Sequence, residues 1–263
     1  MLSTLLMPSS ATEAASLLRD GGWLLGGGTV VMPKVNTGAV PVSRLICLHR
    51  AGLAGIEVNG GTVTVGAATT LGAVGAEHRL SFLHPVVRSI ASPPVRNLAT
   101  VGGNLFVAQP YGDLAVALLA LDARVEVVSA ESTRDIAVGE PIDVDEVVVA
   151  VRFALPSGTW HYRKAMRRKH NSASIATVAA EVTVEDGLVR DARIALGGVA
   201  PRPMRALAAE RALLGRPVDR ESVAAAAAAA TTGIEPFDDA YASAWYRARV
   251  LPVHIRRALL GEE

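Results

Sequence analysis

The chain has 263 residues, of which 50% are hydrophobic and 19% charged, and its formal net charge is +1. This composition indicates a globular protein that can bury a large core, in one large or two modest domains. The balanced charge argues against nucleic acid or an anionic membrane as a partner, and no apolar run approaches the roughly 20 residues that span a bilayer. The N-terminus lacks the basic and apolar regions of a secretory signal, so we expect a cytoplasmic protein.

Cysteine and histidine usage excludes several kinds of site. Cys47 is the only cysteine, which excludes an internal disulfide, a Cys-ligated zinc site and an iron–sulfur cluster held by this chain, because such a cluster needs about four thiolates. The six histidines show no metal-ligand spacing, and no Ser-His-Asp or Cys-His arrangement is recognisable. We therefore expect no metal site and no catalytic acid, base or nucleophile in this chain.

The first half of the chain alternates short strands and helices. Capping and turn signals predict, in chain order, a helix over 12–18 closed by Gly21-Gly22, a strand over 23–25, a strand over 44–48, a hairpin over 56–65 that turns at Asn59-Gly60-Gly61, a short helix capped by Thr69 or Thr70, a helical segment ended by Pro93-Pro94, and a helix over 114–121 with Asp113 as N-cap.

The pattern of predicted elements changes near residue 157. Strands are expected over 124–128 and 146–153, before a linker at Ser157-Gly158. Beyond it the sequence predicts strands around Tyr162, 176–184 and 192–196, with a turn at Asp186-Gly187, and then helices over 204–214, 222–230 and 241–260. We place a domain boundary at 156.

Two glycine-rich segments are candidates for binding a phosphate group. Gly26-Gly27-Gly28-Thr29 follows the apolar strand, and Gly102-Gly103 lies within Thr100–Asn104. Glycine lets the backbone approach a ligand closely, and successive N–H groups in such turns form a concavity that suits a diphosphate. Neither segment has the G-x-G-x-x-G or the G-x-x-x-x-G-K-[ST] pattern, so a nucleotide site here is neither a Rossmann site nor a P-loop. The alternative is that both glycine-rich segments only form turns.

Two other features leave both a functional and a structural interpretation open. Small residues at Gly66-Ala67-Ala68 permit either a planar ring or tight packing against the backbone. The basic cluster Arg163, Lys164, Arg167, Arg168 and Lys169 is either a solvated face or a binding surface, and without interleaved aromatic residues it does not indicate RNA binding.

The chain resembles a known family in several segments that occur in the expected order. These are Leu24–Met32, His84–Arg88, Val95–Leu105, Asp113-Leu114, Leu118–Ala123, Tyr162-Arg163-Lys164, Leu196–Ala206 and Arg256–Leu259. They are similar to the FAD-binding, or medium, subunit of molybdenum hydroxylases of the carbon monoxide dehydrogenase and xanthine dehydrogenase type. The resemblance implies an α+β fold with a vanillyl-alcohol-oxidase-type (PCMH) FAD-binding domain over 1–156. A smaller α+β domain over 157–263, of the CO dehydrogenase flavoprotein C-terminal type, follows it.

The resemblance also implies a set of FAD-binding residues. Backbone N–H groups of the first loop would hold one side of the diphosphate, and the second loop would hold the other side. Asp113 would accept from a ribose hydroxyl, and Val148 or Val149 would line the adenine. Phe106 would pack beside the isoalloxazine ring, and Lys164 would stabilise the N1–C2=O edge of that ring. The full implied set is Gly26, Gly27, Gly28, Thr29, Val30, Thr100, Gly102, Gly103, Asn104, Phe106, Asp113, Val148, Val149 and Lys164.

By the same resemblance, the chain is an electron-transfer subunit of an oxidoreductase. A molybdopterin-binding large subunit would hold the molybdenum cofactor and oxidise substrate, and a small [2Fe–2S] subunit would pass electrons to the FAD of this chain and on to an external acceptor. The implied assembly is a dimer of heterotrimers, and the single cysteine agrees with clusters on another subunit. Two alternatives remain at this point: a stand-alone flavin oxidase or reductase, and a non-catalytic assembly subunit.

Overall fold

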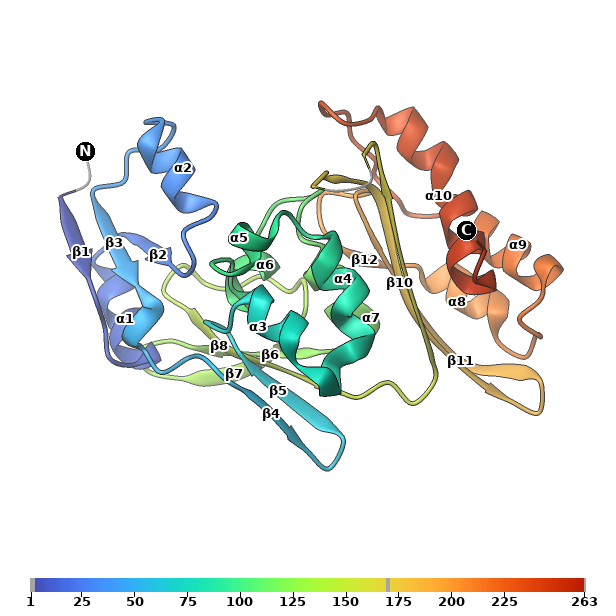
Figure 1. The fold of residues 1–263 in the computed structure, drawn as a ribbon, viewed down its shortest axis with the longest axis horizontal. Helices are drawn as coiled ribbons and strands as arrows, with labels where there is room; N and C mark the ends of the chain where they lie inside the picture. Colours follow the sequence, from blue (N-terminus) through green and yellow to red (C-terminus); the bar gives the residue numbers. More distant parts are fainter. Residues whose placement is uncertain (1–2, 169–170, 263) are drawn as a thin grey trace. The chain divides into compact units, whose positions relative to one another are not determined.

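The computed structural model describes residues 3–168 and 171–262, in which the chain folds into two compact units (Figure 1). Unit 1 comprises residues 1–81, 92–107 and 123–153, and unit 2 comprises residues 82–91, 108–122 and 154–263. Lys169, the last member of the basic cluster, lies outside the described residues.

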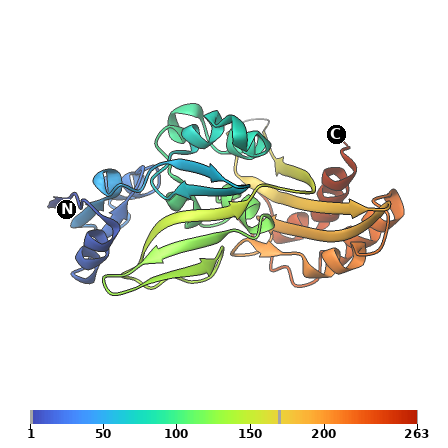
Figure 2. The same cartoon turned by 90° about the horizontal axis from the view of Figure 1, so that it is seen from below.

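The larger sheet of unit 1 has five strands in the order β4-β5-β8-β6-β7, and Figure 2 shows them side by side. Antiparallel pairs join β4 to β5, β6 to β7 and β6 to β8. The strands span Ile56–Asn59 (β4), Thr62–Gly66 (β5), Arg124–Val128 (β6), Thr133–Ala137 (β7) and Val147–Ala154 (β8).

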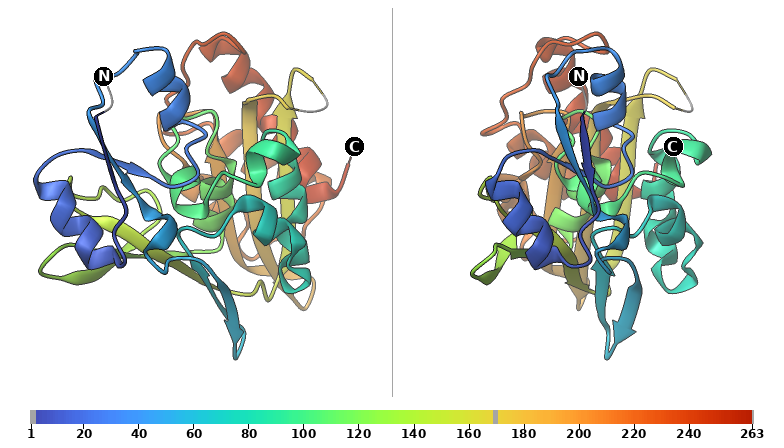
Figure 3. Two further views of the ribbon diagram at one scale, coloured as in Figure 1. Left: turned by 60° about the vertical axis from the view of Figure 1, so that its left-hand side comes forward. Right: turned by 90° about the vertical axis from the view of Figure 1, so that its left-hand side faces the viewer.

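The smaller sheet of unit 1 has three parallel strands in the order β1-β3-β2. Helix α1 packs on β3 and also reaches β6 of the larger sheet (Figure 3), and Ala14 and Ala15 of α1 are fully buried beside Ile46. The elements span Thr4–Leu6 (β1), Ala11–Arg19 (α1), Trp23–Leu25 (β2), Val31–Asn36 (α2), Arg44–Cys47 (β3) and Leu48–Arg50 (η1). The remaining helices of unit 1 are Leu71–Ala76 (α3), Pro93–Arg96 (α5) and Val101–Leu105 (α6), with most of η2 at His78–Leu83.

Unit 2 is built on a four-stranded antiparallel sheet in the order β12-β11-β10-β9. Helices α4 and α7 lie on one face of this sheet and α8, α9 and α10 on the other (Figure 1). The first nine residues of β10 are accordingly all buried, as expected for a strand that is covered on both faces. The elements span His84–Ser89 (α4), Asp113–Ala120 (α7), Thr159–Met166 (β9), Ser174–Glu185 (β10), Leu188–Gly197 (β11), Met204–Arg205 (β12), Leu207–Leu213 (α8), Arg220–Ala229 (α9) and Ala244–Leu260 (α10).

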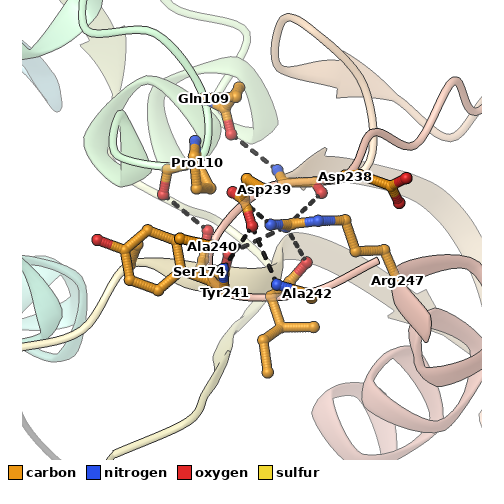
Figure 4. Close-up of polar contacts among 12 residues, drawn as sticks. Gln109, Pro110, Ser174, Asp238, Asp239, Ala240, Tyr241, Ala242 and Arg247 are labelled. Carbon is orange, nitrogen blue, oxygen red and sulfur yellow. Dashed lines mark hydrogen bonds and ion pairs between the residues drawn. The ribbon is translucent and has the colours of Figure 1, made fainter. Parts of the chain in front are cut away.

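Arg247 fixes helix α10 to the sheet of unit 2. Its side chain is fully buried, and its Nη1 donates to the carbonyl oxygens of Ser174, Ile175 and Gly198 at 2.8–3.1 Å (Figure 4). The guanidinium also forms an ion pair with Asp239 at 2.7 Å, so the buried charge is compensated. These contacts join three segments that are far apart in the sequence.

Several local predictions from the sequence are confirmed. The β4–β5 hairpin turns at Gly60-Gly61, where both residues have positive φ, and the β10–β11 hairpin turns at Asp186-Gly187 in the same way. Thr70 caps α3 by accepting from the N–H of Ala73. Helices α9 and α10 begin within three residues of their expected starts.

Several local predictions are wrong. Pro93-Pro94 does not end a helical segment, because α4 already ends at Ser89 and the two prolines form the first turn of α5. The helix expected from residue 204 starts at Leu207, since Met204–Arg205 pair with β11 as strand β12.

Gly102-Gly103 does not form a turn but lies in the first turn of α6, because Thr100 is the N-cap and its Oγ1 accepts from the N–H of Gly103 at 3.2 Å. The N-cap of α7 is Gly112 rather than Asp113, whose carboxylate points into unit 2 and caps nothing. The sequence does not predict strands β1 and β7, because both are short and most of their residues are exposed.

The contacts divide the chain close to the expected boundary at 156, but they assign residues 82–91 and 108–122 to unit 2. The reason is that α7 packs on β10 and β11, and α4 packs on α7 and β9. The division into domains at 156 itself stays a prediction. Over residues 3–168 and 171–262, no helix is both long and apolar enough to cross a membrane.

Candidate functional site

The two glycine-rich segments meet in unit 1. A Cβ on Gly27 would lie 1.6 Å from the carbonyl oxygen of Leu98, and a Cβ on Gly26 would lie 2.8 Å from Oγ1 of Thr100. Only residues without a side chain allow the loop after β2 to approach the start of α6 this closely. The structure therefore brings together two loops that are more than 70 residues apart in the sequence, as a single diphosphate site requires.

The second loop is held from behind by the strand end at Ala67. The N–H of Gly102 donates to the carbonyl of Ala67 at 2.8 Å, and a Cβ on Gly102 would lie 3.0 Å from the Cβ of Ala67. Ala67 in turn donates to the carbonyl of Val149 at 2.8 Å, which connects the loop to β8. The small residues at 66–68 thus serve tight packing, since a Cβ on Gly66 would also overlap the backbone of Leu53.

The first loop presents backbone donors. Among the described residues, no backbone carbonyl accepts from the N–H groups of residues 27–30, which lead into the first turn of α2. Gly28 has φ +71°, a left-handed conformation that turns the chain from the strand into the helix. Successive free N–H groups in a turn form a concavity that favours an anion such as a phosphate group.

The other predicted residues of unit 1 lie on α6 and β8. Asn104 is buried in α6, and Phe106 ends this helix with 53% of its surface exposed. Val148 is buried in β8 and Val149 is half-buried beside it. Direct contacts link the predicted residues Gly26, Gly27, Thr100, Gly102, Gly103 and Asn104, and Val149 is joined to them through Ala67.

Asp113 and Lys164 form a separate buried cluster within unit 2. The side chains are 2% and 3% exposed, and Nζ of Lys164 lies 2.8 Å from Oδ2 of Asp113. Oδ1 of Asp113 accepts from the hydroxyl of Thr177 at 2.7 Å, and Lys164 also donates to the carbonyl of Ser89. Burial raises the pKa of Asp113, while the Lys164 ammonium and the Thr177 hydroxyl act in the opposite direction. Both carboxylate oxygens of Asp113 thus have protein partners, and its predicted ribose contact stays untested.

Sequence patterns did not indicate Ser89, Tyr162 and Thr177 as members of this cluster. Tyr162 lies in β9 two residues before Lys164, and its hydroxyl lies 2.7 Å from Oγ of Ser89. Burial raises the pKa of Tyr162 well above its usual range, and the neighbouring Asp113 charge adds to the shift. Alternation along β9 puts Tyr162 and Lys164 on one face, which is a signal that the sequence contains.

Comparison with known proteins identifies the family of this chain. The family model described as "FAD binding domain in molybdopterin dehydrogenase" matches residues 2–147, which is more than half of the chain. The model "CO dehydrogenase flavoprotein C-terminal domain" matches residues 160–261. The chain belongs to the FAD-binding subunits of the molybdenum hydroxylases. This family assignment and the expected α+β combination of these two domain types are confirmed.

Relatives cover nearly the whole chain. The 6-hydroxypseudooxynicotine dehydrogenase complex subunit alpha of Paenarthrobacter nicotinovorans is 32% identical over 95% of this chain and 90% of its own length. The carbon monoxide dehydrogenase of Hydrogenophaga pseudoflava that lacks the Mo-pyranopterin moiety contains a chain with a TM-score of 0.93 and 31% identity, over 99% of this chain and 96% of that one. Quinoline 2-oxidoreductase of Pseudomonas putida 86 has a TM-score of 0.90 at 26% identity, over 100% and 96%. This flavoprotein subunit therefore shares its whole fold with oxidoreductases of the family.

The position of Gly103 leads to a prediction about cofactor binding. Gly103 is exposed, and among the described residues beyond its chain neighbours and the backbone of α6, a Cβ built on it would come within 4 Å only of Oγ1 of Thr100, at 3.0 Å. We expect Gly103→Val to lower FAD affinity by on the order of tenfold or more, because the branched side chain covers the open face of the loop. Valine is a slightly better helix former than glycine, so far-UV circular dichroism should stay unchanged. Normal flavin occupancy in the purified variant would show that the diphosphate does not approach Gly103.

Proposed function

We propose that this subunit holds one noncovalent FAD, with the diphosphate between the loop at residues 26–30 and the start of α6. The support is the direct approach of Gly26 and Gly27 to the 98–100 segment, which holds the two loops together because a Cβ on either glycine would collide with that segment. Neither loop contains a His or Cys that could attach to the flavin ring. When bound, FAD supplies the redox chemistry, since it takes up and releases electrons.

The residues of the chain have binding and electrostatic roles in this proposal. Backbone N–H groups of residues 27–30 donate to one side of the diphosphate, and Thr100 to Asn104 hold the other side. Phe106, with its exposed ring, is the proposed stacking partner of the isoalloxazine, and Val148 or Val149 lines the adenine. Asp113 is proposed to accept a hydrogen bond from a ribose hydroxyl and Lys164 to stabilise the N1–C2=O edge of the ring, and the buried ion pair holds the two side chains in position.

We further propose that electrons reach this subunit from iron–sulfur clusters of a small partner subunit, and leave to an external acceptor. One cysteine cannot ligate a cluster, so the clusters must be on another polypeptide. A molybdopterin-binding large subunit and a dimer of heterotrimers complete the proposed assembly. The cytoplasmic location expected from the sequence stays a prediction.

Affinity purification of the tagged chain from its native cell tests this assembly. The expected eluate contains two further polypeptides, with iron and molybdenum in fixed ratio to FAD. A metal-free single chain that oxidises a substrate by itself would instead establish the stand-alone flavin enzyme, and a complex without flavin would establish the assembly subunit.

The noncovalent state of FAD is a separate prediction. Acid precipitation of the purified protein should release all flavin into the supernatant, because no side chain in either loop can form a bond to the ring. Absorbance of the supernatant near 450 nm, compared with that of the resuspended pellet, is the measurement. A yellow pellet would contradict the prediction.

A further inference from the structure

A groove of about 700 Å³ lies between α9 and α10 of unit 2. Its floor includes Ala224 and Ala228, two exposed alanines of α9 whose small side chains leave the groove open on that side. Trp245 and Tyr246, at the start of α10, form one end of the groove and expose 67% and 43% of their surface. Large exposed aromatic residues beside a small-residue floor are typical of a protein interaction site.

The charges along this groove have one sign. Arg249 and Arg256 line it, and no acidic residue belongs to its described lining. The guanidinium of Arg249 lies over the ring of Trp245, 5.5 Å from its centroid, so this face of α10 combines an aromatic and a cationic group. The two arginines are seven residues apart, which puts them about 10 Å apart along one face of the helix.

We propose that this groove binds an acidic amphipathic helix of another subunit of the same complex. Carboxylates two turns apart on that helix would pair with Arg249 and Arg256, and small or apolar side chains between them would pack over Ala224 and Ala228 against Trp245. The inference rests on the proposed function, because it assumes that the chain works in a multi-subunit oxidoreductase. The proposed surface includes Arg256 but not its neighbour Arg257.

Charge disfavours a second copy of this chain as the occupant. A twofold contact of the groove with itself would bring the arginines of one copy close to the arginines of the other, and like charges at an interface are unfavourable. An acidic helix instead neutralises both arginines and also covers the exposed aromatic end.

Two kinds of variant test the groove in the whole complex. Ala228→Trp fills the floor, and its control is Ala225→Trp, which puts the same side chain on an exposed α9 position outside the lining. The double variant Arg249→Glu/Arg256→Glu reverses the charge, and its control is Arg211→Glu, an exposed arginine of α8 outside the groove. Each tagged variant is produced in the native cell, and polypeptides, iron, molybdenum and FAD in the eluate are measured.

We expect Ala228→Trp and the double charge reversal to lose at least one partner subunit by roughly tenfold in yield, with the FAD content per chain unchanged. Both controls should retain the complex. A photo-crosslinking residue at position 228 should give a crosslinked peptide that belongs to a complex subunit and is rich in Asp and Glu. A crosslink to a second copy of this chain, or full assembly of both groove variants, would overturn the proposal. Loss of flavin from the unmodified chain would instead count against the proposed function, so the two failures are distinguishable.

Discussion

Gly27→Ala should abolish FAD binding, leaving less than about one tenth of the normal flavin per chain. The added Cβ would lie 1.6 Å from the carbonyl oxygen of Leu98, which is less than half of the roughly 3.5 Å at which such atoms pack. The loop after β2 must therefore move away from the 98–100 segment, and the two halves of the proposed diphosphate site separate. The flavin-to-protein ratio of the purified variant, from its visible spectrum, is the measurement.

A matched control separates a damaged site from a weaker fold. Gly60→Ala in the β4–β5 turn adds a Cβ that meets nothing within 4 Å, but at φ +56° it strains the backbone by about 1 kcal/mol. This control should retain its flavin. Equal loss of flavin from both variants would mean that general destabilisation explains the result, and normal flavin in Gly27→Ala would refute the proposed site.

Asp113→Ala should lower the free energy of unfolding by about 3–5 kcal/mol, because it leaves the Lys164 ammonium buried without its counter-charge. The substitution also removes the acceptor of the Thr177 hydroxyl. Urea unfolding, followed by circular dichroism and by tryptophan fluorescence, measures the loss. Asp113→Ala combined with Lys164→Met should recover part of it, since no buried charge then remains.

An exposed ion pair is the control for this effect. Glu185→Ala removes the partner of Arg190, and both side chains are more than half exposed, so the expected loss is below about 1 kcal/mol. If Asp113→Ala lost no more unfolding free energy than Glu185→Ala, the buried pair would not stabilise the fold. Its role would then be in binding the cofactor.

Local sequence determined the two hairpin turns, the cap of α3 and the composition of the candidate loops. Asn59-Gly60-Gly61 and Asp186-Gly187 predict hairpins because these residues adopt positive φ at little cost, and both hairpins form. The alanine run of α9 and the cap at Thr70 likewise depend only on neighbours within one helical turn. The order of the quoted segments was also enough to indicate the family, since it needs no knowledge of contacts.

Tertiary structure alone decided which of these segments meet. The fit of Gly27 against Leu98 joins residues more than 70 positions apart, and only packing shows that a Cβ is excluded there. The same holds for Asp113, which sequence suggested as a helix cap and which packing of α7 on β10 turns into the partner of Lys164 and Thr177. The groove of α9 and α10 depends on how two helices pack. Local propensity acts through neighbouring residues. The close approach of two chain segments, and the burial of a side chain between them, depend on contacts between residues far apart in the sequence. A single sequence does not display these contacts.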